Sequence, residues 1–387
     1  MPPGSTKCAP REPTWTRMPA PRLLINSLDI SRDGSRILAG TYRRAYGADL
    51  VDGLRTRFGV YCYDAAGKLL RARVIDGSAG VYWVALSADG RYAASGGLVT
   101  ETTGFFDVFD LETGATLLPQ VTTAGRVNRV DLSDDGAVLA ACAADTVYVA
   151  RQTAGAFAAP QTFALGSEAV SVAVSPDGTW VAAVSYDSTV HLFGVSAAGA
   201  MAAGSFAYPL QNASGHSVQF SPDGAWFATA HGGGNHGGSF CLFNVAQFAT
   251  APGSYWDAPV GVGGSVYSVA LALSEGALVP DVAATINASD GGSVVRVRTS
   301  GASPATVWSF ATARPPNCVA MNPSGSLVAI ADGYPENTPG NFYLLDGSGT
   351  CRWTCPSGNM NWPIAVAAGT GAVVGGSDDA NVYFFTP

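Results

Sequence analysis

Charged residues are scarce in this 387-residue chain, where they make up 13% of the sequence. The usual share in soluble domains is roughly 25%. The formal net charge is −8, whereas a protein that binds duplex nucleic acid normally carries a basic stripe. We therefore expect no nucleic-acid partner. Lysine occurs only at Lys7 and Lys68, which nearly removes Schiff-base chemistry from the possible activities.

Long apolar stretches are also missing. No run approaches the ~18 consecutive apolar residues that a membrane-spanning helix needs, so we expect no membrane partner. Residues 1–24 contain three arginines and no apolar run of signal-peptide length. We therefore expect no secretory leader.

The cysteines follow no metal-binding or haem-attachment pattern, because no CxxC or CxxCH occurs. Cys351 and Cys355 would lie on one face of a single strand, roughly 13 Å apart, which is too far for a disulfide. A thiol inside an apolar strand packs as a small hydrophobic group. This setting applies to Cys62, Cys142, Cys241 and Cys318. We expect reduced cysteines and a cytoplasmic protein.

Glycine and proline are abundant, with 47 and 23 residues spread along the chain, and they predict many tight turns. Five turns have the form Ser-x-Asp-Gly, and three further copies are degenerate. The glycines that end the eight copies are Gly34, Gly90, Gly136, Gly178, Gly224, Gly276, Gly325 and Gly371. Successive glycines are 42 to 56 residues apart, close to the roughly 40–50 residues of a four-stranded propeller blade.

Every copy predicts the same local structure. An alternating strand such as Val170–Val174 leads into a turn in which Asp bonds its own backbone and Gly takes a positive φ. A strand of small residues follows, as in Trp180–Val184, and then a β-branched and aromatic strand, as in Val190–Gly194. A more variable fourth strand leads to the next copy. The period of two dominates throughout, and no helix is predicted.

These residues resemble known propeller repeats. The V-x-[VL]-S-P-D-G turn and the phrase Ser185–Phe193 are similar to WD40 repeats, whereas Trp15-Thr, Trp308-Ser-Phe and Trp353-Thr resemble bacterial quinoprotein-like propellers. The resemblance covers about residues 12–386. It implies an all-β, eight-bladed β-propeller with four-stranded antiparallel blades; seven blades are the alternative. We expect a flexible tail over residues 1–11 and one propeller domain over residues 12–387.

The two ends of the chain are predicted to meet. Eight turn motifs but only seven internal fourth strands leave the last copy one strand short. The segment Pro13–Met18 resembles the fourth strands around Trp308 and Trp353. We predict that it pairs with Asn381–Phe385 and closes the ring, which removes a free sheet edge.

In a propeller, the first strand of each copy lines the central channel. The first channel-lining positions are Asn26, Tyr82, Asn128, Val170, His216, Tyr267, Asn317 and Trp362. Trp83 and Arg129 follow one residue further in, and Asp29 and Asp131 lie deeper. One interpretation is a water-filled axle with solvated polar ends. The other is a funnel that binds a small ligand, because convergent polar groups and aromatic rings mark such sites.

Three histidines fall in one copy: His216, His231 and His236. The turn around Gly224 predicts that His216 and His231 lie nearly opposite each other. Three interpretations stay open, namely a structural role, a metal site and a general base. The metal and any other cofactor are not determined by the spacing.

Long loops are predicted on the same face as these histidines, over residues 42–57, 98–104 and 333–341. Long ordered loops often carry function. The first of them is basic, through Arg43, Arg44, Arg55 and Arg57. One interpretation is that this basic loop binds an anionic ligand or an acidic partner segment. The other is that it is a solvated loop without a binding role.

Two functions follow from this pattern. The first is a non-catalytic module that presents its loop face and central funnel to a protein, a peptide or a small ligand. The second is a small-molecule enzyme (a hydrolase, lyase or isomerase) with His216, Tyr82 and Tyr267 as catalytic residues. The ligand-binding residues would be Asn26, Trp83, Asn128, Arg129, His231, His236, Asn317 and Trp362. We expect a monomer, and the sequence leaves catalysis open.

Overall fold

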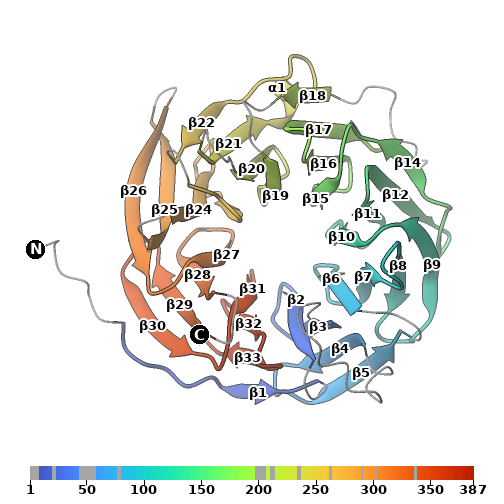
Figure 1. Cartoon of the computed structure of the whole chain (residues 1–387), viewed down its shortest axis with the longest axis horizontal. Coiled ribbons are helices and arrows are strands. Elements are labelled where there is room, and N and C mark those ends of the chain that lie inside the picture. Colours follow the sequence, from blue (N-terminus) through green and yellow to red (C-terminus); the bar gives the residue numbers. More distant parts are fainter. Residues whose placement is uncertain are drawn as a thin grey trace, which may run out of the picture.

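The computed structural model describes residues 8–19, 23–42, 58–75, 80–196, 206–209, 214–232, 237–260, 264–288, 291–300, 303–334 and 338–387. Within these residues the chain is built from β-strands and one short helix, α1 (Val245–Phe248). No described helix is long and apolar enough to cross a membrane. The strands stand in a ring around a central channel (Figure 1). This arrangement confirms the prediction of an all-β propeller.

The ring consists of antiparallel meanders of consecutive strands, each with its first strand nearest the axis (Figure 1). The first two meanders contain β2 (Leu24–Ile30), β3 (Arg36–Tyr42), β4 (Gly59–Asp64) and β5 (Leu69–Val74), then β6 (Gly80–Leu86), β7 (Tyr92–Leu98), β8 (Thr103–Asp110) and β9 (Thr116–Ala124). The next two contain β10 (Val127–Leu132), β11 (Val138–Ala143), β12 (Thr146–Thr153), β13 (Ala156–Phe157) and β14 (Gln161–Ala164), then β15 (Ala169–Val174), β16 (Trp180–Ser185), β17 (Thr189–Gly194) and β18 (Phe206–Pro209).

The second half of the chain repeats this plan. It contains β19 (Ser214–Phe220), β20 (Trp226–Gly232), β21 (Ser239–Asn244) and β22 (Trp256–Pro259), then β23 (Val269–Ala272), β24 (Asp281–Ala288), β25 (Gly291–Ser300) and β26 (Ser303–Thr312). The last strands are β27 (Pro316–Met321), β28 (Leu327–Asp332), β29 (Asn341–Asp346) and β30 (Cys351–Pro356), then β31 (Asn361–Val366), β32 (Val373–Ser377) and β33 (Val382–Phe385). A single residue pair, Tyr42 with Gly80, joins the meanders β2–β5 and β6–β9 into one eight-stranded sheet.

Both ends of the chain meet in one sheet. β1 (Trp15–Arg17) pairs antiparallel with β33, so that Trp15 lies opposite Phe384 and Arg17 lies opposite Val382. The sheet has the strand order β1-β33-β32-β31. The predicted pairing of Pro13–Met18 with Asn381–Phe385 is confirmed. It covers an edge of β33 that would otherwise offer free backbone groups to other chains.

The segment before β1 is attached to β30. Of the predicted tail, residues 1–7 lie outside the described residues, whereas Pro10 pairs with Thr354 and Cys8 forms a disulfide with Cys351. The expectation of reduced cysteines is therefore wrong for this pair. The sequence argument considered only Cys355 as a partner for Cys351, because both lie on one strand. The true partner lies 343 residues away and comes close only through ring closure.

The repeated turns have the hydrogen bonds that their sequence predicts. Ser31 Oγ donates to Asp33 Oδ1 at 2.7 Å and accepts from the N–H of Arg36 at 2.9 Å. Gly34 has a φ of +73°, which a residue with a Cβ adopts only with strain. The N–H of Ser35 donates to Asp33 and holds the pKa of that carboxyl below its usual value. The same Ser–Asp contact recurs at Ser87, Ser133, Ser175 and Ser221.

Backbone hydrogen bonds between these turns link neighbouring sheets around one end of the channel. The N–H of Arg32 donates to Ala88 O at 2.8 Å, and the N–H of Ala88 donates to Asp134 O at 2.9 Å. The N–H of Asp134 then donates to Pro176 O at 3.0 Å. Proline has no N–H, so Pro176 accepts this bond and cannot extend the series.

The core lies between neighbouring sheets. The second strand of each meander is rich in small residues, and β11 is buried along its whole length. Small side chains let the sheets approach closely. A Cβ on Gly96 would lie only 2.6 Å from Cγ1 of Val127 in the next sheet. A larger residue there would force the two sheets apart.

Candidate functional site

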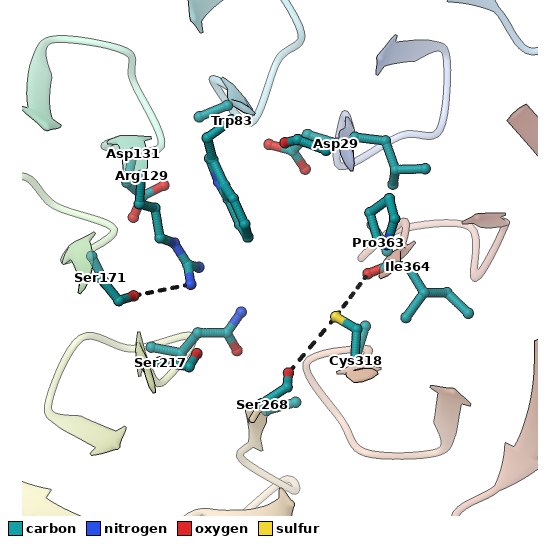
Figure 2. A pocket seen from close by; sticks show the side chains of 18 of the residues that line it. Asp29, Trp83, Arg129, Asp131, Ser171, Ser217, Ser268, Cys318, Pro363 and Ile364 are labelled. Carbon is teal, nitrogen blue, oxygen red and sulfur yellow. Dashed lines mark hydrogen bonds between the residues drawn. The ribbon is translucent and has the colours of Figure 1, made fainter. Parts of the chain in front are cut away.

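The candidate site is the central channel, which has a volume of about 1920 Å³. Inner strands from all around the ring contribute side chains to it, and Figure 2 shows its wall from close by. The channel has two ends. The entrance lies where the inner strands begin, near Tyr82, His216 and Tyr267, and the exit lies at the Ser-x-Asp-Gly turns.

A β-bulge on most inner strands places the predicted entrance residues. In β2, for example, Ile25 pairs with Thr41 and Ser27 pairs with Gly40, so Asn26 between them has no partner residue. An extra residue of this kind re-aims its side chain away from the sheet. The same shift occurs at Tyr82, Asn128, Val170, His216 and Asn317.

The entrance asparagines link adjacent sheets. Asn26 Nδ2 donates to Tyr82 O at 2.9 Å, and Asn128 Nδ2 donates to Ala169 O at 2.9 Å. Asn317 is 8% exposed, and its Nδ2 donates to Asn361 O at 2.7 Å and to Gly333 O at 3.2 Å. These donors, predicted to bind ligand, already bond backbone carbonyls, and each of them reaches at least one carbonyl of the neighbouring sheet.

His216 makes a similar link. Its Nδ1 lies 3.0 Å from Val266 O, and because a carbonyl only accepts, Nδ1 carries the proton. The ring stacks on Tyr267 at 4.9 Å between centroids and 11° between planes. Burial lowers the pKa of His216, although the bond to Val266 opposes this effect. His216 is therefore a neutral, weakly basic imidazole.

His231 does not join His216 at the entrance. The bulge pairs Gly215 with His231 and places the His216 ring over Gly232, so the two histidines lie one residue out of register with each other. His231 is fully buried, its Nε2 lies 2.6 Å from Thr229 Oγ1, and burial lowers its pKa to about 3. His236 lies outside the described residues. Among the residues that the structure does describe, no three His, Cys, Asp or Glu side chains gather as a metal site.

Aromatic and charged side chains surround the entrance. Tyr186 and Tyr267 are 48% and 39% exposed. Arg126 lies over the ring of Tyr82 at 4.8 Å, and its Nε donates to Asn128 Oδ1 at 2.8 Å. Trp362 also borders the channel. Three long loops were predicted on this face. The structure describes all of residues 98–104 and, of the loop 333–341, residues 333–334 and 338–341. Residues 43–57 of the first loop lie outside the described residues.

Deeper in the channel, Trp83 and Arg129 form one unit. The guanidinium carbon of Arg129 lies 4.6 Å from the centroid of the Trp83 ring. Nη1 of Arg129 donates to Ser171 Oγ at 3.2 Å, across the boundary to the next sheet. Figure 2 shows both side chains reaching from the wall toward the middle of the channel. The sequence placed these two residues correctly, one step inside the entrance.

Two carboxyl groups, those of Asp29 and Asp131, also line the channel. Asp29 Oδ2 accepts from the N–H of Leu86 at 2.8 Å, and Asp131 Oδ2 accepts from the N–H of Val174 at 2.8 Å. Burial raises the pKa of Asp29 to about 7 and that of Asp131 to about 6. The charge of Asp131 raises the pKa of Asp29 further, and Arg129 lowers both. The two groups therefore interact although their sheets are not adjacent.

The sequence argument missed a row of serines that also cross sheet boundaries. Ser27 Oγ accepts from the N–H of Val84 at 2.8 Å, and Ser268 Oγ accepts from the N–H of Val319 at 3.3 Å. Ser171 Oγ accepts from the N–H of Val218 at 3.3 Å in the same way. Each serine directly follows an entrance residue in the sequence. This recurring position was the feature of the sequence from which the serines could have been predicted.

Comparison with known proteins gives the same architecture. Residues 161–193 match the family "WD domain, G-beta repeat". The chain is a β-propeller, and this one stretch of it is similar to a WD40 repeat. No curated protein sequence matches it. The likeness to WD40 repeats predicted from the Ser-Pro-Asp-Gly turns is confirmed, whereas the likeness of the tryptophan segments to quinoprotein propellers stays a prediction.

Solved structures of similar shape are also propellers. Chaetomium thermophilum Sqt1 bound to the N-terminus of the ribosomal protein L10 has a TM-score of 0.69 and 17% identity, over 96% of this chain and 98% of that one. Sqt1 by itself has a TM-score of 0.68 and 18% identity, over 95% and 96%. The β-propeller domain of Cps50 (Swd1) from Myceliophteria thermophila has a TM-score of 0.56 and 13% identity, over 79% and 95%. At these identities the likeness shows the fold alone.

Proposed function

We propose that this protein is a non-catalytic interaction module that binds an extended segment of a partner protein at the channel entrance. The entrance contains two kinds of side chain, those that bond to a neighbouring sheet and those that stay exposed, and this difference supports the proposal. The asparagines and His216 hold neighbouring sheets together, whereas Tyr186 and Tyr267 stay exposed. Tyrosine is enriched in protein interfaces because it adds a large, rigid contact area and a hydroxyl group.

The size of the channel suits a chain segment. About 1920 Å³ exceeds the ~300–1,000 Å³ of typical small-molecule pockets. An extended peptide adds only about 3.3 Å per residue along its path, so several residues fit between entrance and exit. Sqt1, whose fold is similar, was solved with the N-terminus of a partner protein, which is an analogy for this mode of binding.

The alternative, a small-molecule enzyme, would use His216 as its base. In favour of it, the proton on Nδ1 leaves Nε2 free to accept a proton. Against it, burial lowers the pKa of this imidazole, and the ring lies flat against Tyr267. We therefore propose that His216 and Tyr267 form a stacked platform for a partner side chain, and that Tyr82 with Arg126 forms a second platform.

Our proposal for the architecture is eight blades in a single domain over residues 12–387, in which the eight-stranded sheet counts as two blades. We propose a monomer, because β1 covers the edge at which the ring closes. The cytoplasmic location stays a prediction from the sequence. The Cys8–Cys351 disulfide weighs against it, because disulfides are rare in reducing compartments.

A peptide-display selection on the immobilised protein tests the binding function. We expect enriched peptides whose binding to the Tyr186→Ser and Tyr267→Ser variants is at least tenfold weaker. The matched control is Leu278→Ser, which removes an 89% exposed apolar side chain from the opposite face of the ring. Enrichment that is equally strong on the tyrosine variants, or no enrichment above the blank support, would overturn the proposal.

A further inference from the structure

Two other arginines of this protein, one buried and one exposed, show what Arg129 lacks. Arg296 is 3% exposed, and its Nε and Nη2 both donate to Asp281 Oδ2, at 2.9 and 2.7 Å. Arg298 holds the same carboxylate through its own Nε and Nη2, both at 2.8 Å. In both cases Nε and Nη2 of the guanidinium donate hydrogen bonds to one carboxylate, which is a favoured geometry for an arginine–carboxylate pair.

In the described chain, Arg129 has no carboxylate on its Nε–Nη2 edge, and its Nε is itself shielded from solvent. Its Nη1 is used by Ser171, whereas its Nε has no hydrogen-bond partner among the described residues. Nor does its guanidinium take part in an ion pair within the described part of the chain. Arg129 is half-buried, and the carboxyls of Asp29 and Asp131 act on it only from a distance. An incoming carboxylate would supply the direct charge-assisted hydrogen bond that this guanidinium lacks.

The guanidinium is also held in place before any ligand arrives. The Trp83 ring covers one of its faces at 4.6 Å, and Ser171 fixes Nη1. Such fixation reduces the ordering cost of binding. Arg129 follows Asn128 by one residue, so it lies just inside the entrance, within reach of a segment that enters the channel (Figure 2).

We propose that Arg129 recognises a carboxylate of the partner segment, either its C-terminal carboxylate or the side chain of an Asp or Glu. This inference rests on the proposed peptide-binding function and names its anchor. The two channel carboxyls do not occupy the position of this anion. Asp29 and Asp131 each direct an oxygen to a backbone N–H of the next sheet. A positively charged partner group would instead be repelled by the free guanidinium.

Three capped peptides test the proposal by isothermal titration. They are acetyl-Tyr-Ala-Ala with a free C-terminus, the same peptide amidated, and amidated acetyl-Tyr-Asp-Ala. We expect the first, the third or both to bind, and the amidated neutral peptide to bind at least tenfold more weakly, because it cannot accept the charge-assisted hydrogen bond from Arg129. Binding of the first alone identifies a C-terminal carboxylate, and binding of the third alone identifies an acidic side chain.

Variants of Arg129 test whether binding needs its guanidinium group or only a positive charge. Arg129→Lys and Arg129→Gln should each remove the preference for the carboxylate. Arg32→Gln is the matched control, because Arg32 also lines the channel but lies at its exit and pairs with Asp134, and it should keep that preference. Equal binding of all three peptides, no binding of any, or equal losses in the Arg32 and Arg129 variants would overturn the inference. If display-selected peptides bind without a carboxylate, the proposed peptide-binding function is supported. In that case only the role of Arg129 in recognising a carboxylate is rejected.

Discussion

Replacing Trp15 by alanine should open the ring at the sheet where it closes. Trp15 is 8% exposed and stacks on Phe384 at 5.0 Å between centroids. Its Nε1 donates to Ala65 O at 3.0 Å, so it ties β1 to the neighbouring sheet. Truncation of a buried tryptophan to alanine costs about 3–5 kcal/mol. Only three residue pairs hold β1 to β33, so this loss should be enough to free the strand.

Hydrogen exchange measured by mass spectrometry resolves the effect. In Trp15→Ala, we expect the amides of β33 to exchange faster than those of β28 and β29. The matched control is Trp308→Ala. Trp308 also donates its Nε1 to a carbonyl of the next sheet, Gly347 O at 3.2 Å, but it lies inside the continuous chain. Its loss should destabilise the protein without a local effect on β33.

Two results would refute this reasoning. The first is an identical exchange pattern in the two tryptophan variants, because ring closure would then be no weaker than any other sheet. The second is unchanged protection of β33 in Trp15→Ala, because the pairing of β1 would then not depend on the tryptophan. A freed β33 edge should also increase aggregation on heating, which light scattering would detect.

Three further predictions concern stability. Cys8→Ser should lower the free energy of unfolding by about 2–4 kcal/mol, and a reductant should lower the melting temperature of the wild type but not of the variant; equal sensitivity to the reductant would contradict this. Asn317→Ala should cost about 1–3 kcal/mol in urea unfolding, because it leaves two carbonyls without a donor, and it should cost more than Asn26→Ala, which loses one bond. Burial raises the pKa of Asp29 from 3.8 to about 7, so its contribution to the free energy of unfolding is fully present below pH 4 and is lost as the pH rises from 4 through 7. Asp29→Asn should therefore flatten the fall in stability between pH 4 and 7 by about 1–2 kcal/mol, with allowance for channel water, and an unchanged slope would refute the assignment.

The sequence predicted those features that depend on local chemistry. The Ser31–Asp33 turn needs only its own five residues, so its motif identifies it in every copy. Ring closure was also predictable, because the segment around Trp15 resembles the fourth strands that contain Trp308 and Trp353. The number of turn motifs then showed which strand was missing.

Features that depend on how two sheets meet were harder to predict. A bulge shifts the register by one residue, so Gly215 rather than His216 lies opposite His231, although the turn between them was placed correctly. The bond from Asn317 to Asn361 O joins residues of different sheets, and its geometry exists only after assembly. The Cys8–Cys351 disulfide depends on closure in the same way.

The most direct test of the binding function is photo-crosslinking from the entrance. A photo-reactive phenylalanine analogue would replace Tyr267 in one variant and Leu278, on the opposite face, in another. Each purified variant would be irradiated in extract from cells that naturally make the protein. We predict a discrete crosslinked protein from position 267 that is absent from position 278 and is lost on addition of a display-selected peptide. No adduct from position 267, or the same adducts from both positions, would contradict the claim that the entrance face binds a partner.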